Sequence, residues 1–450
     1  MSDKLPSGIL RIVENNHGGV SPEHRKNTAG MKETSLPTPE TVKIPMQMHI
    51  GAPCEPLVKA GDTVEIGDRI ADSEAAVSAP IHASVSGKVK RITEIRNPAD
   101  GGLVKAVEIN ADEEQKWRQD IKAPEIHSRE DFIKAVRDSG LVGLGGAGFP
   151  THVKLDIKAP AKADLLIANG AECEPYITVD DYCMQHQSDD LLAGIAACLK
   201  WIGIERCVIA IEDNKPEAIR ALAEKIRSER EKYKAVDVMA MPADYPRGAE
   251  KVLIQNVSGR HVPLGKLPAD TGCLVLNVTT LMFIGQYLRT GKPLVDKLLT
   301  VDGSAVGKAQ NVRVPIGTRI GDVMEFCGGF SEQPALIMMG GPMMGLALSS
   351  PDYVVLKNNN ALLALTEDDF IIDKEQECIR CAKCLDRCPM YLQPVSLMRA
   401  VRAGDAEKLQ ELGVMNCMEC GSCAYICSAH IPLVQYIRHG KKILREAGGK

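Results

Sequence analysis

The spacing of hydrophobic and polar positions changes several times along the chain. Residues 1–43 show no regular hydrophobic period and are punctuated by Gly18, Gly19 and several prolines, which predicts an extended arm. Residues 44–112 carry short β-rich runs separated by Gly-Asp and Ser-Gly turns, a pattern typical of a small antiparallel β-domain. The N-terminal quarter is therefore expected to be an arm followed by strands.

The middle of the chain alternates between two periods. A helical pattern over 130–139 is followed by compact apolar runs at 165–168 and 207–211, which suit parallel strands, and by a charged helix at 216–232. This alternation predicts an α/β domain over 128–305 whose strands are joined by crossover connections. Residues 306–366 return to a β-rich pattern with one short helix at 322–327, and residues 367–450 are cysteine-rich with helical segments over 396–412.

Two stretches without charged residues, 271–288 and 333–351, could be mistaken for membrane spans. A spanning helix needs about 20 mainly apolar residues. The first stretch contains Asn277 and Gln286, and the second is broken by Gly340 and Pro342, so we predict buried strands and turns in both. Since no secretory signal opens the chain, a reducing cytoplasmic setting is expected, which favours metal ligation over disulfides.

Composition changes this picture at one point only. Lys and Arg number 54 against 59 Asp and Glu, and 44% of residues are hydrophobic, which is typical of a soluble protein and argues against a nucleic-acid binder. The 15 cysteines are unusual because eight of them fall between 378 and 427. The other seven stand singly and are expected to be small buried side chains: Cys54, Cys173, Cys183, Cys198, Cys207, Cys273 and Cys327.

The eight clustered cysteines form two blocks with the same C-x2-C-x2-C-x3-C spacing, the arrangement of bacterial two-cluster ferredoxins. In that arrangement the fourth cysteine of each block binds the other cluster. Zinc or disulfides are the alternatives, but zinc sites do not normally show this doubled spacing. The predicted ligand sets are Cys378, Cys381, Cys384 and Cys427 for one [4Fe–4S] cluster, and Cys417, Cys420, Cys423 and Cys388 for the other.

A second motif, Gly143-x-Gly145-x-x-Gly148, satisfies a dinucleotide-type glycine pattern. Glycines let backbone N–H groups approach a phosphate closely. A flexible turn is the alternative, and because the motif follows a helical pattern rather than a strand it is not an ordinary Rossmann turn. His152, next to the motif, is expected to be a structural residue rather than a catalyst.

The string GGAGFPTHVK at 145–154, followed by NGAECEP at 169–175, resembles the flavin- and NADH-binding subunit of respiratory complex I and its relatives. Within that superfamily the chain is identified as a member of the RnfC family of the ion-translocating Rnf complex. The match runs in order from the GGV at 18–20 through HIGAPCEPLVKAGD and VSAPIHASVSGKV to the cysteine-rich tail.

This resemblance implies a nucleotide site. The glycines of the loop would line the FMN phosphate and ring, Lys154 would supply positive charge, Asn169 and Glu172 would hold polar groups of FMN, and Glu174 would lie near the nicotinamide nucleotide. Phe149 is a nicotinamide-stacking candidate, with a core aromatic as the alternative. This chain departs from its relatives at two places: it has Ala249-Glu250 where they have two consecutive acids, and Thr279 where complex I has an acid. For the loops at 245–250 and 277–280, the alternative is that they are strand ends and surface loops without a nucleotide contact. The implied residues are Gly143, Gly145, Gly146, Gly148, Phe149, Lys154, Asn169, Glu172 and Glu174, and more loosely Tyr245, Gly248, Glu250, Asn277 and Thr280.

The resemblance also implies a multidomain α/β fold. It consists of an arm at 1–43, a β-rich barrel-sandwich-like domain at 44–112, an FMN/NADH-binding α/β domain at 128–305, an SLBB-like β-grasp domain at 306–366 and a helical two-cluster ferredoxin-like domain at 367–450. The β-domain is similar to lipoyl and biotinyl carriers, but its hairpin tip at 74–76 has no attachment lysine. We therefore expect it to be structural.

The implied function is that of a peripheral electron-transfer subunit on the cytoplasmic side of the cell membrane, within an ion-translocating NADH:ferredoxin oxidoreductase. Its cofactors would be noncovalent FMN and two [4Fe–4S] clusters, with NAD(H) as substrate. Its partners would be the membrane and iron–sulfur subunits of the complex, which exchange electrons with ferredoxin and move Na⁺ or H⁺. Because the flavin carries the hydride chemistry, no catalytic acid or base is expected. The alternatives are a soluble flavin and iron–sulfur reductase, such as a microcompartment cobalamin reductase, and a cluster-only electron carrier.

Overall fold

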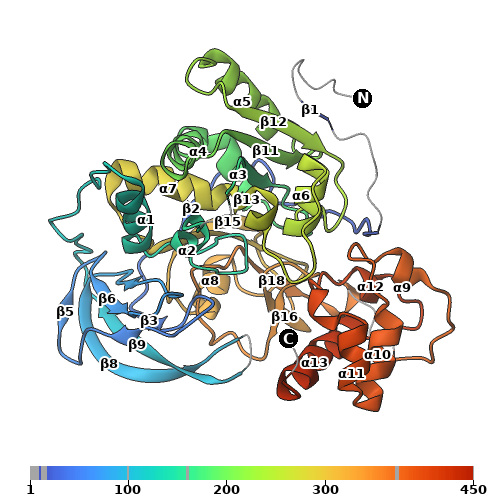
Figure 1. Cartoon of the computed structure of the whole chain (residues 1–450). Helices are drawn as coiled ribbons and strands as arrows, with labels where there is room; N and C mark the ends of the chain where they lie inside the picture. Colours follow the sequence, from blue (N-terminus) through green and yellow to red (C-terminus); the bar gives the residue numbers. More distant parts are fainter. Residues whose placement is uncertain (1–9, 12–17, 99–100, 159–161, 370–373, 449–450) are drawn as a thin grey trace.

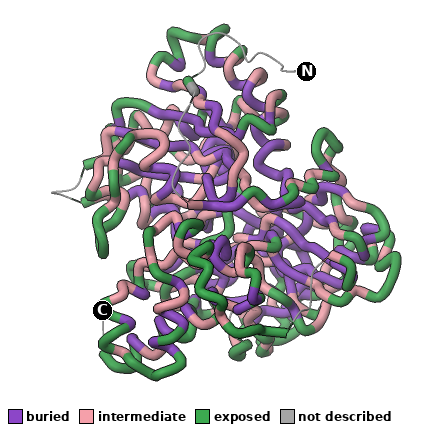
Figure 2. Tube along the Cα trace, turned by 90° about the vertical axis from the view of Figure 1, so that its right-hand side faces the viewer, coloured by how far each residue is buried: buried purple, intermediate pink, exposed green. Residues whose placement is uncertain are grey.

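The computed structural model describes residues 10–11, 18–98, 101–158, 162–369 and 374–448. Figure 1 shows the α/β part at the top, the N-terminal β-part at the lower left and the cysteine-rich helices at the lower right, with a mixed sheet between them. Figure 2 shows that buried positions gather along the strands and the inward sides of the helices. The predicted multidomain α/β architecture is confirmed.

The N-terminal β-part consists of two antiparallel sheets, in the orders β3-β9-β8-β5 and β4-β6-β7. Alternate residues of β3 point inward, so that Val42 and Ile44 are fully buried, as expected for strands with one covered face. The strands are β3 (Thr41–Pro45), β4 (Glu55–Pro56), β5 (Thr63–Val64), β6 (Arg69–Asp72), β7 (Ile81–His82), β8 (Gly87–Arg96) and β9 (Leu103–Ala111).

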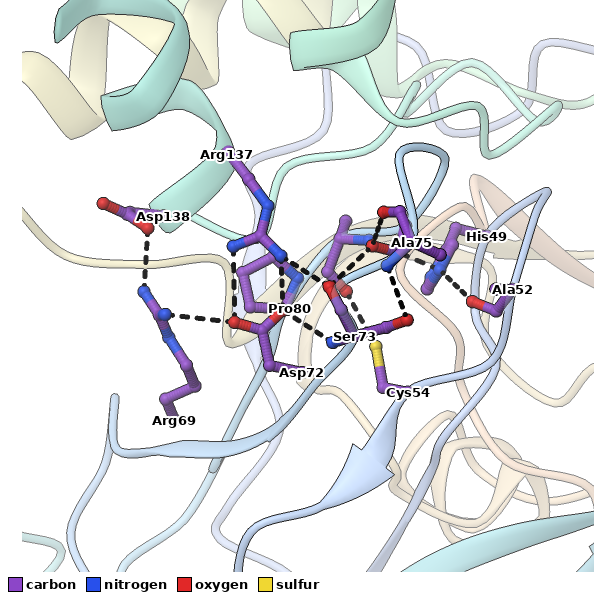
Figure 3. Close-up of polar contacts among 12 residues, drawn as sticks. His49, Ala52, Cys54, Arg69, Asp72, Ser73, Ala75, Pro80, Arg137 and Asp138 are labelled. Atoms are coloured by element: carbon purple, nitrogen blue, oxygen red, sulfur yellow. Dashed lines mark hydrogen bonds and ion pairs between the residues drawn. The ribbon is translucent and has the colours of Figure 1, made fainter.

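Helix α1 (Arg129–Asp138) holds this β-part in place (Figure 3). The Arg137 guanidinium donates to the Asp72 carboxylate at 2.6 Å and to the Ser73 carbonyl at 2.8 Å. Arg69 donates in the opposite direction, to Asp138 at 2.9 Å. Asp72 and Ser73, at the base of the hairpin that carries a prosthetic group in carrier domains, are thus tied to the α/β part.

The α/β part is built on a five-stranded sheet in the order β1-β12-β11-β10-β13, and every pairing in it is parallel. The chain runs outward from β10 to β11 and β12 on one side, then returns to place β13 on the other side of β10. The strand order therefore reverses between β10 and β13, the position at which open α/β sheets form a ligand-binding crevice. The strands are β1 (Leu10–Arg11), β10 (Leu165–Gly170), β11 (Arg206–Glu212), β12 (Val236–Met241) and β13 (Cys273–Asn277).

Helices cover both faces of this sheet, and α4 and α7 pack closely because Gly194 and Gly285 lie where the two helices touch. The predicted helices at 130–139 and 216–232 are confirmed as α1 and α5. The helices of this part besides α1 are α2 (Thr151–Leu155), α3 (Val179–His186), α4 (Ser188–Ile202), α5 (Pro216–Ser228), α6 (Glu250–Ser258), the 3₁₀ turn η1 (Pro268–Thr271) and α7 (Val278–Thr290).

The prediction for the charge-free stretch 271–288 is wrong in its second half, which is helix α7 rather than strands and turns. All residues from Val278 to Gly285 are buried, so this helix shows no polar face from which its period could be recognised. The stretch 333–351 holds two strands and a turn, as predicted. In the described part of the chain, no helix is long and apolar enough to cross a membrane.

The mixed sheet has the order β17-β16-β18-β14-β15-β2. Strand β2, from the N-terminal arm, pairs with β15, and β14, which precedes the predicted boundary at 305, pairs with β15 and β18. Leu299, Val312 and Leu362 form its core with helix α8. The elements are β2 (Thr34–Ser35), β14 (Asp296–Asp302), β15 (Gln310–Pro315), α8 (Ile320–Phe326), β16 (Leu336–Met339), β17 (Leu346–Leu348), β18 (Ala361–Leu365) and η2 (Glu367–Asp369).

The cysteine-rich part is helical. The predicted helical segment at 396–412 is divided by Gly404, which ends α10 in a left-handed conformation at φ +66°. Leu397 and Val401 of α10 pack against Ile437 and Leu444 of α13. The helices are α9 (Lys383–Asp386), α10 (Pro394–Ala403), α11 (Ala406–Glu411), η3 (Val414–Asn416), α12 (Ser422–Tyr425) and α13 (Leu433–Glu446).

Candidate functional site

Two of the predicted site residues lie at the point where the strand order of the α/β sheet reverses. Asn169 is near the end of β10 and Asn277 is the last residue of β13, and the two are direct partners in the parallel register. Asn277 also caps α7, accepting a hydrogen bond from the Thr279 N–H at 2.9 Å. Two asparagines therefore stand side by side at the carboxyl edge, beside the N-terminus of a helix.

The predicted glycine loop lies against this edge. A hydrogen bond of 2.8 Å from the Gly143 N–H to the Phe149 carbonyl closes it, and Leu144 N–H donates to the Thr280 hydroxyl at 3.0 Å. A Cβ on Gly145 would lie 3.1 Å from the Asn277 side chain, so any larger residue would require that side chain to shift. Residues 145–147 are exposed, Gly148 is buried and Phe149 is half-buried.

The loop at 245–250 comes from the far side of the same edge. Asn169 donates from its amide to the Gly248 carbonyl at 2.8 Å. Lys154, on α2, forms an ion pair with Glu250 at the start of α6. The structure thus brings together the glycine loop, Lys154, Asn169, the 245–250 loop, Asn277 and Thr280, which come from five separate segments of the chain.

The acids Glu172 and Glu174 hold loops at the same edge. The Glu172 carboxylate accepts the backbone N–H groups of Asp180 at 2.6 Å and Asp181 at 3.3 Å, at the start of α3. The Glu174 carboxylate accepts the N–H groups of Met343 at 3.0 Å and Met344 at 2.8 Å, in the turn between β16 and β17. Burial raises the pKa of Glu174 to about 7. Their contacts to a nucleotide remain predictions.

Lys26, from the N-terminal arm, holds the backbone of the segment 172–177. This lysine was not identified as a site residue from the sequence. Its ammonium donates to three backbone carbonyls, those of Glu172 at 2.8 Å, Glu174 at 2.9 Å and Ile177 at 2.6 Å. A lysine in an irregular arm carries no pattern that distinguishes it from a solvated one. The arm is therefore part of the site's framework.

Several charged groups near the loop are buried. Asn277 donates to the Asp180 carboxylate at 2.7 Å, and burial raises the pKa of Asp180. Burial lowers the pKa of Lys297, next to Asp180, to about 8. Burial also lowers the pKa of His152 to about 4, so its imidazole is neutral at pH 7.

The clustered cysteines fall into two groups in space. Cys388, Cys417, Cys420 and Cys423 line one pocket, whose walls are completed by apolar side chains such as Leu392 and Ile437. Cys388, from the first block, is thus grouped with three cysteines of the second block. Four cysteine thiolates around one pocket are the donor set that a [4Fe–4S] cluster takes.

The second group contains the fourth cysteine of the second block. Cys427 packs with Cys378 and Cys384 in one apolar cluster, while Cys381 is exposed. Among the described residues, no three His, Cys, Asp or Glu side chains converge as they would around a single metal ion. In a cubane each thiolate binds a different iron, so the sulfur atoms surround the cluster. Of the seven single cysteines, six are buried, as expected, and Cys173 is half-buried.

A hydrogen bond joins the nucleotide edge of the α/β part to the cysteine-rich part. The Tyr245 hydroxyl donates to the Cys420 carbonyl at 2.6 Å, and both residues are buried. The arm passes beside this contact, since the Val20 N–H donates to the Tyr245 carbonyl at 2.7 Å. Gly18 adopts φ +82°, and a Cβ there would lie 2.7 Å from the Pro389 nitrogen, so a side chain is excluded.

Family profiles match four consecutive parts of the chain. The RnfC barrel sandwich hybrid domain matches residues 14–114, the Nuo51 FMN-binding domain residues 136–286, the SLBB domain residues 298–347 and the 4Fe-4S dicluster domain residues 370–428. The order of these domains agrees with the four structural parts in Figure 1.

Curated relatives match over almost the whole length. The C subunit of the proton-translocating ferredoxin:NAD(+) oxidoreductase complex of Clostridium ljungdahlii is 41% identical, covering 97% of this chain and 95% of the relative. The C subunit of the Na(+)-translocating ferredoxin:NAD(+) oxidoreductase complex of Acetobacterium woodii is also 41% identical, covering 94% and 96%. This chain belongs to the RnfC family. The family predicted from the glycine and cysteine motifs is confirmed.

Other similar proteins are more distant. The C subunit of the ion-translocating oxidoreductase complex of Rhodobacter capsulatus, also an RnfC-family protein, is 38% identical, covering 95% of this chain and 83% of the relative. Among solved structures, the "Crystal structure of NAD+-reducing [NiFe]-hydrogenase in the H2-reduced state" contains a chain 20% identical, with a TM-score of 0.48. That alignment covers 72% of this RnfC-family chain and 63% of the hydrogenase chain.

Proposed function

We propose that this chain is the electron-transfer subunit of an ion-translocating ferredoxin:NAD⁺ oxidoreductase, in which it exchanges electrons between NAD(H), FMN and two [4Fe–4S] clusters. The observation that carries the proposal is the Tyr245–Cys420 hydrogen bond of 2.6 Å. Tyr245 begins the loop 245–250, which contacts Asn169 at the nucleotide edge. Cys420 is one of the four cysteines that line the pocket. Electrons crossing between the two halves therefore have a short route through protein.

At the nucleotide edge, FMN when bound would accept a hydride from NADH and release electrons one at a time. The protein's own task is to hold and orient the nucleotides. The exposed part of the glycine loop offers backbone N–H groups to a phosphate, and Lys154 offers a positive charge. Asn169, Asn277 and Thr280 stand at the switch point, where they can fix the ring. The remaining candidates, Phe149, Glu172, Glu174, Gly248 and Glu250, surround this edge.

In the cysteine-rich part, the proposed ligands follow the crossed order. The pocket lined by four cysteines would hold the cluster nearer to the flavin, because Cys420 touches Tyr245. The other cluster would lie farther out, beside the exposed Cys381. The protein supplies thiolates and an apolar environment that sets the reduction potential. The proposed ligand sets are Cys388, Cys417, Cys420 and Cys423 for the inner cluster and Cys378, Cys381, Cys384 and Cys427 for the outer one.

We further propose that the chain acts as a peripheral subunit on the cytoplasmic side of the membrane, bound to membrane and iron–sulfur subunits that exchange electrons with ferredoxin. The names of the relatives support the complex but not the coupling ion. A proton-translocating and a Na⁺-translocating relative are each 41% identical to this chain. The match of residues 14–114 to the RnfC N-terminal domain favours this assignment over a soluble reductase.

Replacing Lys154 with methionine tests the nucleotide site. We expect the dissociation constant of FMN to rise between about tenfold and a hundredfold, because one charge-assisted contact is lost. NADH-driven reduction of ferricyanide at limiting FMN should fall accordingly. Both are measured on anaerobically purified protein, by fluorescence titration of the flavin-depleted chain and by absorbance.

Lys158→Met is the matched control, since Lys158 lies four residues later, is 81% exposed and, among the described residues, forms an ion pair with Asp156 alone. It should bind FMN as the parent does. Parental FMN affinity and NADH-driven activity in the Lys154 variant would show that the nucleotide site is misplaced.

A further inference from the structure

The carbonyl groups of the glycine loop are held by other domains. Asn358, from the segment before β18, donates from its side-chain amide to the Gly146 carbonyl at 2.6 Å. The Ile50 N–H of the N-terminal β-part donates to the Gly148 carbonyl at 3.1 Å. Two domains outside the α/β part therefore fix alternate peptide groups of one loop.

Holding these carbonyls also aims the N–H groups that follow them. In a trans peptide unit the C=O and the next N–H point in opposite directions. Since the Gly146 carbonyl faces Asn358, the Ala147 N–H faces away from it. Gly146 and Ala147 are exposed, so this N–H is presented on the open side of the loop. An oriented N–H of this kind is what a phosphate or a flavin carbonyl requires.

The segment that carries Asn358 has a fixed base. Lys357, next to it, is fully buried, and its ammonium donates to the Pro80 carbonyl at 2.6 Å and to the Gly140 carbonyl at 2.7 Å. Pro80 belongs to the hairpin region drawn in Figure 3. On the other side of Asn358, the Asn359 side chain accepts the Leu356 N–H at 2.6 Å. The amide of Asn358 is thus delivered from a fixed point rather than from a free loop.

The glycine loop is shaped to admit this side chain. Gly148 adopts φ +66°, and a Cβ there would lie 3.3 Å from the Asn358 amide nitrogen, tighter than nine in ten real Cβ contacts. Glycine at 148 therefore leaves room for Asn358, a role separate from any contact with a nucleotide. The signal could not be seen in the sequence, because more than 200 residues separate the two partners.

We infer that Asn358 of the SLBB-like region is a positioning residue of the flavin site, which holds the Gly146 carbonyl so that the Ala147 N–H faces the flavin. Asn358 acts through the loop. The inference rests on the proposed FMN site. It also gives the SLBB-like region a task within this chain, as a clamp on the nucleotide loop.

The test compares Asn358→Asp, Asn358→Ala and a matched control, Asn360→Ala. Aspartate keeps the shape of asparagine but replaces the amide donor with a carboxylate oxygen that would face the Gly146 carbonyl. This variant therefore distinguishes loss of the hydrogen bond from loss of packing. Asn360 lies two residues away, and its side chain makes no hydrogen bond to any described residue. FMN binding is measured by fluorescence titration of anaerobically purified, flavin-depleted protein, together with iron content and the thermal midpoint.

We expect the dissociation constant of FMN to rise about tenfold in Asn358→Ala and further in Asn358→Asp, with parental values in Asn360→Ala. NADH:ferricyanide turnover in the Asn358 variants should return to the parental rate at saturating FMN, with iron content unchanged. A merely structural role would not give this recovery.

FMN binding by the parent protein distinguishes failure of this inference from failure of the proposed function. Parental FMN affinity in both Asn358 variants would overturn the inference while leaving the FMN site intact. Failure of the parent itself to bind FMN would instead overturn the proposed function, and this inference with it.

Discussion

Replacing Cys388 with alanine should remove the cluster whose other three ligands belong to the second cysteine block. Iron content is expected to fall from about eight to about four atoms per chain, because one iron of the cubane then lacks its thiolate and the weakened cluster is lost during purification. The basis is spatial, since Cys388 shares a pocket with Cys417, Cys420 and Cys423. Iron analysis and electron paramagnetic resonance of the dithionite-reduced protein measure the result.

Paired variants show which cluster is lost. In the crossed arrangement, the spectrum of Cys388→Ala matches that of Cys420→Ala, and the spectrum of Cys427→Ala matches that of Cys381→Ala. An uncrossed arrangement would pair Cys388→Ala with Cys381→Ala and so refute the ligand sets. Cys327→Ala serves as the control, because Cys327 is a buried cysteine in the core of the mixed sheet, and it should keep its full iron content.

Replacing Gly146 with valine should abolish FMN binding, with a loss of affinity of at least about a hundredfold. Gly146 has φ +117°, which costs a β-branched residue about 1–3 kcal/mol, and a Cβ there meets no atom of the described residues within 4 Å. That open space is where we place the flavin, so the valine side chain would occupy it. Fluorescence titration of the flavin-depleted protein gives the affinity, and iron content should be unchanged.

Gly61→Val controls for backbone strain alone. Gly61 lies in the N-terminal β-part at φ +94°, and a Cβ at this position would again meet no described atom within 4 Å. It should destabilise the β-part to a similar degree without affecting FMN. If Gly146→Val binds FMN as Gly61→Val does, the flavin does not lie over the glycine loop.

Local patterns predicted much of the fold. The compact apolar runs at 165–168 and 207–211 became β10 and β11, which are buried on both faces as central parallel strands are. The helical period predicted over 216–232 became α5, which ends at Ser228 and has one buried face. Helix α7 was missed since its first eight residues, 278–285, are all buried and leave no polar stripe. An apolar run alone does not distinguish a fully buried helix such as α7 from a buried strand.

Some residues of the candidate site could likewise be predicted from the sequence, and others could not. The cysteine blocks and the glycine loop could be singled out because their spacing along the chain is that of known cluster-binding and dinucleotide-type motifs. Lys26 and Asn358 could not, since each meets its partners across more than 140 residues and each looks like a surface residue in sequence. Their roles follow only from the contacts between domains.

The central claim is that electrons pass within this one chain between NAD(H) and the clusters by way of FMN. Its most direct test is to reduce the anaerobic, flavin-loaded protein with a low-potential one-electron donor, remove the donor and add NAD⁺. Two clusters hold two electrons and fully reduced FMN holds two more, so we predict up to about two NADH per chain, and none from the flavin-depleted protein. Clusters that stay reduced in the flavin-loaded protein after NAD⁺ is added, with no NADH formed, would contradict the account.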